Sequence, residues 1–505
     1  METRSKQPSK SHDTVADDIV ADLRQGELDT QIPKAESKRV LMKIDLVIMP
    51  LIVLSMTLAF LDKNGLAYAA IYGLETDTHL KGQEYSWLGS IFYFGYLGME
   101  FPNLWLITRF PIGRYMGGCL VAWGGCLCLL AACKNFAGLA TIRFLLGAFE
   151  AALLPCLLLV NTRWYRREEQ PLRTAFWYNT LAGVFGGILS YAIGHISGSL
   201  ATWKYIFLIY GSVTIVAGVA VFFTLPNSPA TAWFLSEKEK KIALIRVSEN
   251  QTGLGSHKNI KLNQIIDALA DPKYYILMIF VIAQAITNAG ITNFNPLIIS
   301  GYGFSQAKTT LLATPQAAVA MVAQALITAL TFYVPNIRSL LWVFSSLVAM
   351  AGAIMVHVID QEANRNASLA GVYIMGFYNV PWVLALSLQT SNTAGTGKKS
   401  FVSISIAIFY VTNQITSAVG NIIGPQFFLE SQSPTYPLGI GAMLCCFAIM
   451  AVTGIVYFFI CLSENRKRDR LHGTIDQGSE RVLAGFEADI DDLTDRENVR
   501  FRYTY

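Results

Sequence analysis

The stretch FLDKNGLAYAAIYGL, residues 60–74, places an acid and a base side by side within an apolar run of the chain. That run spans residues 44–74 and exceeds the roughly 20 apolar residues that a helix needs to cross the hydrocarbon core of a bilayer. Each ionised side chain at membrane depth costs about 3 kcal/mol on insertion scales. We therefore expect Asp62 and Lys63 to be retained either for a function or for pairing.

The composition of the whole chain agrees with a membrane location. Of the 505 residues, 53% are hydrophobic and only 15% are charged, which exceeds the apolar share of ordinary soluble domains. The first forty residues are polar and contain no apolar core of a cleavable secretory signal. We expect a membrane protein whose amino terminus stays in the cytoplasm.

Several classes of function are excluded by what the sequence lacks. The net charge is only +4, and no run of Lys and Arg is interleaved with aromatic residues, so we expect no nucleic-acid partner. The eight cysteines lie in apolar stretches without paired CxxC spacing, and the six histidines are scattered without an HExxH pattern. We expect no metal site and no cofactor. Because the chain also lacks a nucleophile or phosphate-loop motif, an enzyme is not expected.

Apolar windows of spanning length recur along the chain and divide it into two halves. They lie at residues 44–74, 85–107, 115–133, 137–161, 174–198, 203–225, 273–299, 309–332, 339–359, 368–390, 400–424 and 437–462. The long hydrophilic segment Pro226–Pro272 separates them six and six. The prediction is an all-α membrane protein of twelve transmembrane helices in two six-helix bundles. Its parts are an N-terminal tail (1–42), a first bundle (43–226), a linker (227–272), a second bundle (273–463) and a C-terminal tail (464–505).

The distribution of basic residues predicts the orientation of these spans. Lys and Arg collect in short cytoplasmic loops, and the loops expected inside contain clusters such as Arg163, Arg166, Arg167 and Arg173. The loops expected outside hold only Lys81, Lys134, Lys204, Lys308 and Arg365. Both termini, the linker and both tails are therefore expected on the cytoplasmic side.

The fourth and tenth spans resemble each other. Residues 145–155 read LLGAFEAALLP and residues 373–383 read YIMGFYNVPWV, each with a glycine, an aromatic residue, a polar group and a proline in that order. Two repeats around a site at the middle of the membrane leave this kind of trace in a transporter.

Two further charges, Arg143 and Glu150, lie in the fourth span, seven residues apart and hence on one helix face about 10 Å apart. Together with Asp62 and Lys63 they form a possible quartet of two acids and two bases. One interpretation is a structural ion-pair network that ties the first helix to the fourth. The other is proton coupling: protonation of Asp62 or Glu150 leaves a positive charge on Lys63 or Arg143 that attracts an organic anion.

The second half offers neutral groups instead of charges. We select Asn288 and Asn293 in the seventh span, Tyr378 and Asn379 in the tenth, and Asn413 in the eleventh as candidates for hydrogen bonds to a substrate. Tyr68, in the first span, is a further candidate. For each of them the alternative is an interhelical hydrogen bond, which contributes about 0.6 kcal/mol on average.

Sequence stretches over most of the chain resemble the major facilitator superfamily, and within it the fungal allantoate permease group of the anion:cation symporter family. The stretches include LDKNGLAYAAIYGL (61–74), EYSWLGSIFYFGYLGMEFP (84–102), RFLLGAFEAALLP (143–155), SNTAGTGKKS (391–400), GNIIGPQFF (420–428) and DLTDRENVRFRYTY (492–505). The resemblance implies a plasma-membrane permease, expected to be monomeric in the bilayer, that takes up a small organic anion with protons. Members of the group carry allantoate, ureidosuccinate, small peptides, or nicotinate and other vitamins. In bacterial relatives the residues that match Asp62, Lys63, Arg143 and Glu150 serve proton coupling and substrate binding.

The sequence departs from the superfamily in two places. The loop LITRFPIGRYMGG, residues 106–118, keeps Arg109 and Arg114 but lacks the Asp of the usual gating motif, and Lys63 replaces an Arg found in many relatives. We assign Arg109 and Arg114 to the gate on the cytoplasmic side, together with Glu100, which lies near the end of the second span where a carboxylate reaches the interface. Export of a metabolite, or a nutrient sensor with the same fold, remain alternatives.

Overall fold

The computed structural model describes residues 33–166, 169–170, 173, 181–248, 270–359, 364–392, 419–473 and 501–505. In this part of the chain the regular elements are helices, and no strand occurs. Nine helical stretches of the described residues are long and apolar enough to cross a membrane. The second expected span is the helix Glu84–Arg109, and the fifth is described only over Leu181–Ile193. The eleventh expected span, 400–424, lies almost entirely outside the described residues. The all-α prediction is confirmed.

The helices form two bundles, and α11 lies between them in the sequence. The first bundle contains α2 (Lys34–Ile71), α3 (Leu74–Asp77), α4 (Glu84–Arg109), α5 (Ile112–Leu130), α6 (Phe136–Glu150), α7 (Leu153–Trp164), α9 (Leu181–Ile193) and α10 (Thr202–Thr224). The turn η1 (Pro229–Thr231) and α11 (Glu237–Ser248) follow. The second bundle contains α13 (Pro272–Ser300), α14 (Gln306–Tyr333), α15 (Arg338–Val358), α16 (Arg365–Ile374), η2 (Met375–Asn379), α17 (Val380–Ser391), η3 (Gly424–Phe427), η4 (Glu430–Gln432) and α20 (Pro437–His472).

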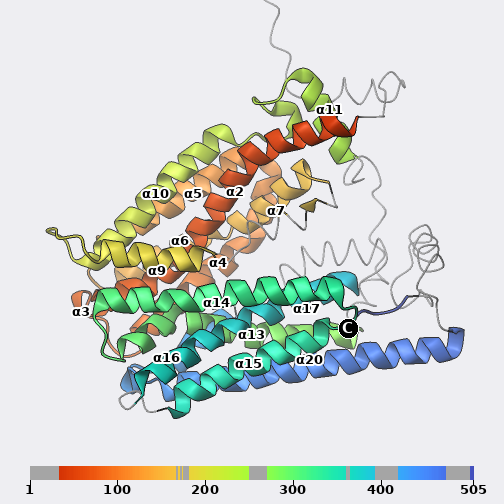
Figure 1. The fold of residues 1–505 in the computed structure, drawn as a ribbon. Coiled ribbons are helices and arrows are strands. Elements are labelled where there is room, and N and C mark those ends of the chain that lie inside the picture. Colours follow the sequence, from red (N-terminus) through yellow and green to blue (C-terminus); the bar gives the residue numbers. More distant parts are fainter. Residues whose placement is uncertain are drawn as a thin grey trace, which may run out of the picture.

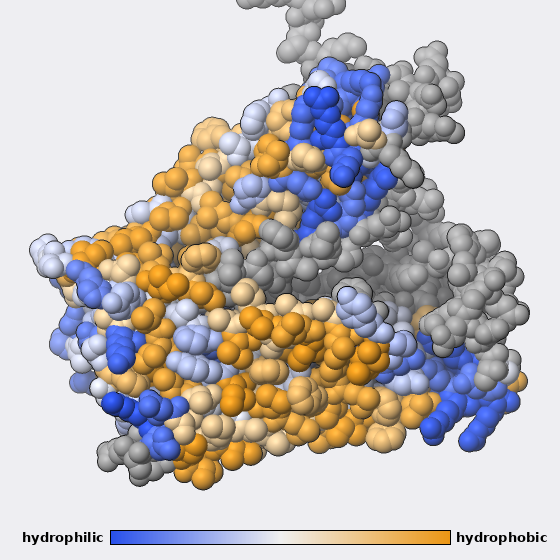
Figure 2. Space-filling view, in the orientation of Figure 1, coloured by the Kyte–Doolittle hydropathy of each residue, from blue (hydrophilic) through white to orange (hydrophobic). Residues whose placement is uncertain are grey.

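The two bundles meet at one end of the molecule and diverge toward the other (Figure 1). We call the end where α3 lies the α3 end, and the opposite end, where α11 lies, the α11 end. Figure 2 shows a broad hydrophobic surface over both bundles, with hydrophilic residues gathered toward the two ends. Phe223 is 78% exposed and Leu326 is 66% exposed. Such exposed apolar faces fit contact with lipid.

Glycines allow close helix crossings within the first bundle. A Cβ atom added at Gly95 of α4 would overlap the carbonyl oxygen of Phe144, and one added at Gly147 of α6 would overlap that of Phe92. Small residues permit this backbone approach, which is a common basis of helix packing in membranes. The crossing fixes α6, and the charged residues on it, against α4.

The fourth and tenth spans are both interrupted, and each break has a proline as its local cause. Proline cannot donate to the carbonyl four residues earlier, which is Ala151 for Pro155 and Phe377 for Pro381. The fourth span accordingly divides into α6 and α7 directly after Glu150, and the tenth passes through the tight turn η2, Met375–Asn379. The similarity predicted between these two spans therefore has a structural counterpart.

Contacts between the bundles concentrate at the α3 end in the described residues. Tyr85 donates its hydroxyl to the carbonyl of Asn293 at 3.0 Å, and Ser86 donates to that of Phe428 at 3.1 Å. The ring of Tyr85 packs edge-on against the ring of Phe294, with 5.5 Å between the centroids. Hydroxyl–carbonyl hydrogen bonds and aromatic packing thus hold this end together. Among the described residues, no ion pair joins the two bundles there.

The crossing of α9 and α14 depends on Gly187, because a Cβ atom there would overlap Oγ1 of Thr314. We expect Gly187→Leu to separate the bundles at the α3 end, whereas Gly118→Leu, at a glycine with nothing within 4 Å of an added Cβ, leaves them in place. The measurement is the rate of maleimide labelling of Ser86→Cys in a background without the native cysteines. Labelling should accelerate only with Gly187→Leu, and equal rates in the two leucine variants would contradict the packing argument.

Candidate functional site

An ion pair joins α2 to α6 in the middle of the first bundle. Lys63 Nζ lies 3.3 Å from Glu150 Oε1, and the side chains are 31% and 3% exposed. The second carboxylate oxygen of Glu150, Oε2, has no hydrogen-bond partner among the described residues. Glu150 is therefore a buried acid with a single cationic contact, whereas Lys63 is partly accessible.

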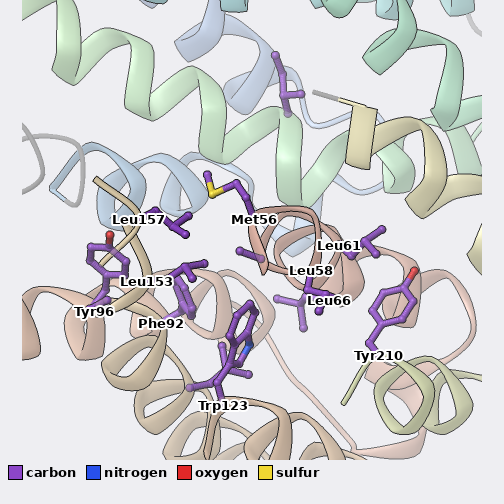
Figure 3. Packing of buried hydrophobic residues seen from close by; sticks show 14 of the residues in the cluster. Met56, Leu58, Leu61, Leu66, Phe92, Tyr96, Trp123, Leu153, Leu157 and Tyr210 are labelled. Atoms are coloured by element: carbon purple, nitrogen blue, oxygen red, sulfur yellow. The ribbon is translucent and has the colours of Figure 1, made fainter. Parts of the chain in front are cut away.

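Asp62 faces a different helix from its neighbour Lys63. The indole Nε1 of Trp123, on α5, donates to Asp62 Oδ2 at 2.9 Å, and Oδ1 has no hydrogen-bond partner in the described part of the chain. Figure 3 shows Trp123 beside α2, among the buried apolar side chains Leu58 and Leu66. Adjacent helical residues point about 100° apart, and Asp62 and Lys63 accordingly contact different helices, α5 and α6.

Arg143 packs against α4 rather than against an acid. Its Nε donates to the carbonyl of Leu88 at 3.4 Å, and its guanidinium carbon lies 5.4 Å from the ring centroid of Phe92. Among the described residues it forms no ion pair within 4 Å, although it acts electrostatically on Asp62 and Glu150. The expected quartet is thus close together, but it is not a closed ion-pair network.

Five polar side chains of the second bundle form two short hydrogen-bonded groups. Tyr378 donates its hydroxyl to Asn288 Oδ1 at 3.2 Å, and Asn288 Nδ2 donates to Asn421 Oδ1 at 3.2 Å. Asn379 donates to Gln324 Oε1 at 3.2 Å. Tyr378, Asn379, Asn288 and Gln324 are half-buried, so each keeps some surface for a ligand. The interruption at η2 positions Tyr378 and Asn379.

Three of the residues selected from the sequence do not belong to these two hydrogen-bonded groups. Asn293 donates to the carbonyl of Ala289 at 2.9 Å, and its amide lies against Gly89 of α4, at the bundle contact of the α3 end. Tyr68 is buried beside Gly186 of α9. Asn413 lies outside the described residues.

The three residues assigned to a gate lie in different surroundings. Glu100 is fully buried, and neither of its carboxylate oxygens has a hydrogen-bond partner in the described chain. The expectation that it reaches the membrane interface is therefore wrong, because the helix turns its side chain inward. Arg109 and Arg114 are exposed, and the guanidinium carbon of Arg109 lies 5.4 Å from the ring centroid of Trp105.

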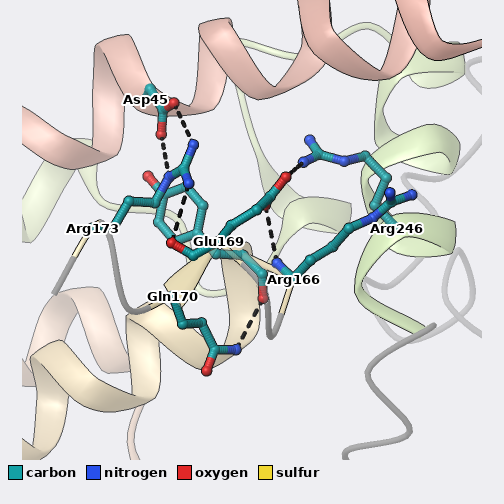
Figure 4. A network of polar contacts seen from close by, with 7 residues as sticks. Asp45, Arg166, Glu169, Gln170, Arg173 and Arg246 are labelled. Carbon is teal, nitrogen blue, oxygen red and sulfur yellow. Dashed lines mark hydrogen bonds and ion pairs between the residues drawn. The ribbon is translucent and has the colours of Figure 1, made fainter. Parts of the chain in front are cut away.

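A charged network at the α11 end was not anticipated as a unit. Arg173 donates from Nε and Nη2 to the two carboxylate oxygens of Asp45, at 2.9 and 2.8 Å, and Arg246 of α11 donates to Glu169 at 2.6 Å (Figure 4). Glu169 also accepts from the backbone N–H of Arg166. The network connects α2 and α11 through the segment after α7. Its arginines were visible in the sequence as cytoplasmic charges, but their acidic partners were not identifiable by spacing.

Comparisons with known proteins agree with this architecture. Residues 52–420 match the Major Facilitator Superfamily. An uncharacterized transporter of Schizosaccharomyces pombe is 37% identical over 98% of this chain and 91% of its own length. Allantoate permease of Saccharomyces cerevisiae is 31% identical over 94% of this chain and 88% of its own length. A bacterial homologue of the human lysosomal transporter Spinster, solved in an inward-facing, unoccupied conformation, has a similar fold, with a TM-score of 0.59, 16% identity, and coverage of 85% of this chain and 97% of that one.

The bidentate contact between Asp45 and Arg173 predicts a measurable coupling. In a double-mutant cycle of Asp45→Asn and Arg173→Met, we expect a coupling energy of about 1 kcal/mol in the free energy of unfolding, because a charge-assisted pair is strong but Asp45 is partly exposed. The matched control is the exposed pair Lys238–Glu36, for which we expect almost none. Thermal unfolding in detergent measures both cycles. A coupling no larger than that of the control pair would show that the network contributes no stability.

Proposed function

The chain belongs to the Major Facilitator Superfamily and is a multi-pass membrane transporter, and from that premise we propose that it takes up a small organic anion together with protons. The substrate class is a carboxylate such as allantoate, ureidosuccinate, a vitamin carboxylate or a small peptide. The similarity to an allantoate permease supports an anionic substrate. The ion pair between Lys63 and the buried Glu150 is the observation that carries the proposal.

The coupling between anion and proton follows from competition for Lys63. An anion that approaches the partly exposed Lys63 side chain takes its ammonium group away from Glu150, whose second oxygen has no hydrogen-bond partner in the described part of the chain. Leaving a buried carboxylate uncompensated costs about 3–5 kcal/mol. Protonation of Glu150 removes this cost, so anion and proton favour each other's binding, and this linkage is reciprocal.

Arg143 and Asp62 complete the charge balance. Arg143 has no ion pair among the described residues, and its positive charge therefore adds to that of Lys63 when an anion arrives. Trp123 donates a hydrogen bond to one oxygen of Asp62, and the other oxygen has no hydrogen-bond partner in the segments that the structure describes. We assign Asp62 to a second protonation step and Arg143 to anion binding.

The neutral groups of the second bundle recognise the rest of the substrate. Half-buried amides and the phenol of Tyr378 can donate and accept hydrogen bonds without a change of charge. Exchanging their contacts with Asn288 or Gln324 for contacts with a substrate leaves the number of hydrogen bonds nearly constant. Shape recognition in this half is thereby separated from titration in the first half.

The proposed cycle alternates between opening at the α11 end and opening at the α3 end. From the distribution of basic residues in the loops we propose that the α11 end and both tails lie in the cytoplasm, and we assign the protein to the plasma membrane as a monomer. With the α3 end closed, the described conformation corresponds to access from the cytoplasm. Arg109 and Arg114, exposed at the α11 end, are proposed to contact the second bundle when that end closes, with the buried Glu100 supporting the same helix.

Neutral replacements of the acids should uncouple transport from the proton gradient. In proteoliposomes with an imposed pH gradient, screened with allantoate, nicotinate, dipeptides and sugar acids, we expect Glu150→Gln and Asp62→Asn to abolish accumulation but to retain some exchange. Glu237→Gln, at an acid that is 77% exposed, serves as the control and should accumulate substrate normally. If both buried-acid variants concentrate substrate as well as the parent does, the assignment of proton coupling fails.

Neutral replacements of the cations should weaken binding instead. We expect Lys63→Met and Arg143→Met each to raise the dissociation constant of the transported anion at least about tenfold, because each removes about 1.4 kcal/mol or more of attraction. Lys308→Met, at an exposed lysine beside Phe304, is the control. Binding is measured by titration calorimetry with the anion that the uptake screen identifies. Unchanged affinity in both variants would place anion recognition elsewhere.

A further inference from the structure

The segment 501–505, FRYTY, lies against the second bundle at the α11 end, although it is remote from that bundle's helices in sequence. Tyr503 is only 3% exposed. The segment contacts the first turn of α13, the end of α17 and the final turns of α20. This burial of a polar stretch requires a specific set of partners, because each buried backbone group needs a hydrogen bond.

Two asparagines pair with the backbone of the segment. Asn465 of α20 donates to the carbonyl of Tyr503 at 2.8 Å and accepts from its N–H at 2.9 Å. Asn392, which follows α17, donates to the carbonyl of Thr504 at 2.8 Å and accepts from its N–H at 2.7 Å. A side-chain amide has the donor and acceptor of a peptide group. Each asparagine therefore forms, with one residue of extended backbone, the pair of hydrogen bonds that a neighbouring strand would form.

Side-chain contacts add selectivity for an aromatic and a basic residue. The ring of Tyr503 lies between two cations: Lys273 Nζ is 3.4 Å and the guanidinium carbon of Arg468 is 4.8 Å from its centroid. Arg468 also donates to the hydroxyl of Tyr503 at 3.1 Å and to the carbonyl of Phe501 at 2.8 Å. Arg502 donates to Asp469 at 2.8 Å.

We propose that α13, α17 and α20 form a peptide-binding site whose occupant is the chain's own segment 501–505, and that its occupancy fixes α17 in the conformation open at the α11 end. Asn392 is the connecting residue, because its Nδ2 also donates to Tyr457 of α20 at 2.8 Å. The segment therefore ties the end of α17 to α20. Since η2 interrupts the span directly before α17, release of the segment frees α17 to move separately from α16. This inference does not depend on the transported substrate or on proton coupling.

The binding site can be tested with a chain that ends at residue 500 and with the free peptide FRYTY, labelled for fluorescence anisotropy. We expect the shortened protein to bind the peptide, and the full chain to bind it much more weakly because its site is occupied. A peptide with Tyr503→Ala should bind at least about tenfold more weakly, since it loses two cation–π contacts and a hydrogen bond. A peptide with Tyr503→Phe keeps the ring and should lose no more than about threefold.

The effect on α17 is measured by hydrogen–deuterium exchange of the same proteins. We expect residues 380–391 to exchange faster in the shortened protein and in full-length Tyr503→Ala, and added FRYTY peptide to restore slow exchange in the shortened protein. Exchange in α15 should not change and serves as the internal control. Binding of the peptide without a change in α17 would overturn the fixing role, and failure of the shortened protein to bind it would overturn the site itself.

Discussion

The Lys63–Glu150 ion pair sets the constraint on which the first bundle depends. A carboxylate buried among apolar helices is tolerated only while a cation or a proton neutralises it. The pair therefore requires α2 and α6 to stay close, and the glycine crossing of α6 with α4 at Gly147 holds α6 in that position. Lys63 is partly accessible and Glu150 is not. In the proposed mechanism a competing anion therefore reaches the cation first, and protonation then stabilises the acid.

The two halves share one backbone arrangement, a glycine contact next to a helix break, but carry different chemical groups there. In each half a glycine of the interrupted span packs on the backbone of a neighbouring helix: Gly147 on α4 and Gly376 on α14. In each, the polar group after that glycine stands next to the break, Glu150 in the first half and Asn379 in the second. The first half carries a titratable group there and the second a neutral amide. Under the proposed function, this shared geometry with a different charge in each half brings a proton and a neutral part of the substrate to one site.

Sequence reasoning predicted what depends on apolar length and helical pitch, and it failed where partners come from distant segments. The spans and the shared face of Arg143 and Glu150 follow from such local rules. The hydrogen bond between Trp123 and Asp62 could not be predicted in this way, because a tryptophan in an apolar window is indistinguishable from a packing residue. The depth of Glu100 was misjudged because its position along a span does not reveal which side of the helix it occupies. The docking of segment 501–505 was not predicted either, since its asparagine partners carry no periodic signal.

The interrupted spans also explain why polar contacts gather at the α11 end. Beyond each break, α7 and α17 are short helices whose far ends need their own attachment. The segment after α7 is attached through Glu169 and Arg173 to α11 and α2, and α17 is attached through Asn392 to segment 501–505 and α20. A neutral hydrogen bond contributes about 0.5–1.5 kcal/mol, and one to a charged group about 1.5–3 kcal/mol. These attachments lie within each bundle, whereas at the α3 end the hydrogen bonds of Tyr85 and Ser86 and the close crossing at Gly187 join one bundle to the other, so the described conformation is closed at the α3 end.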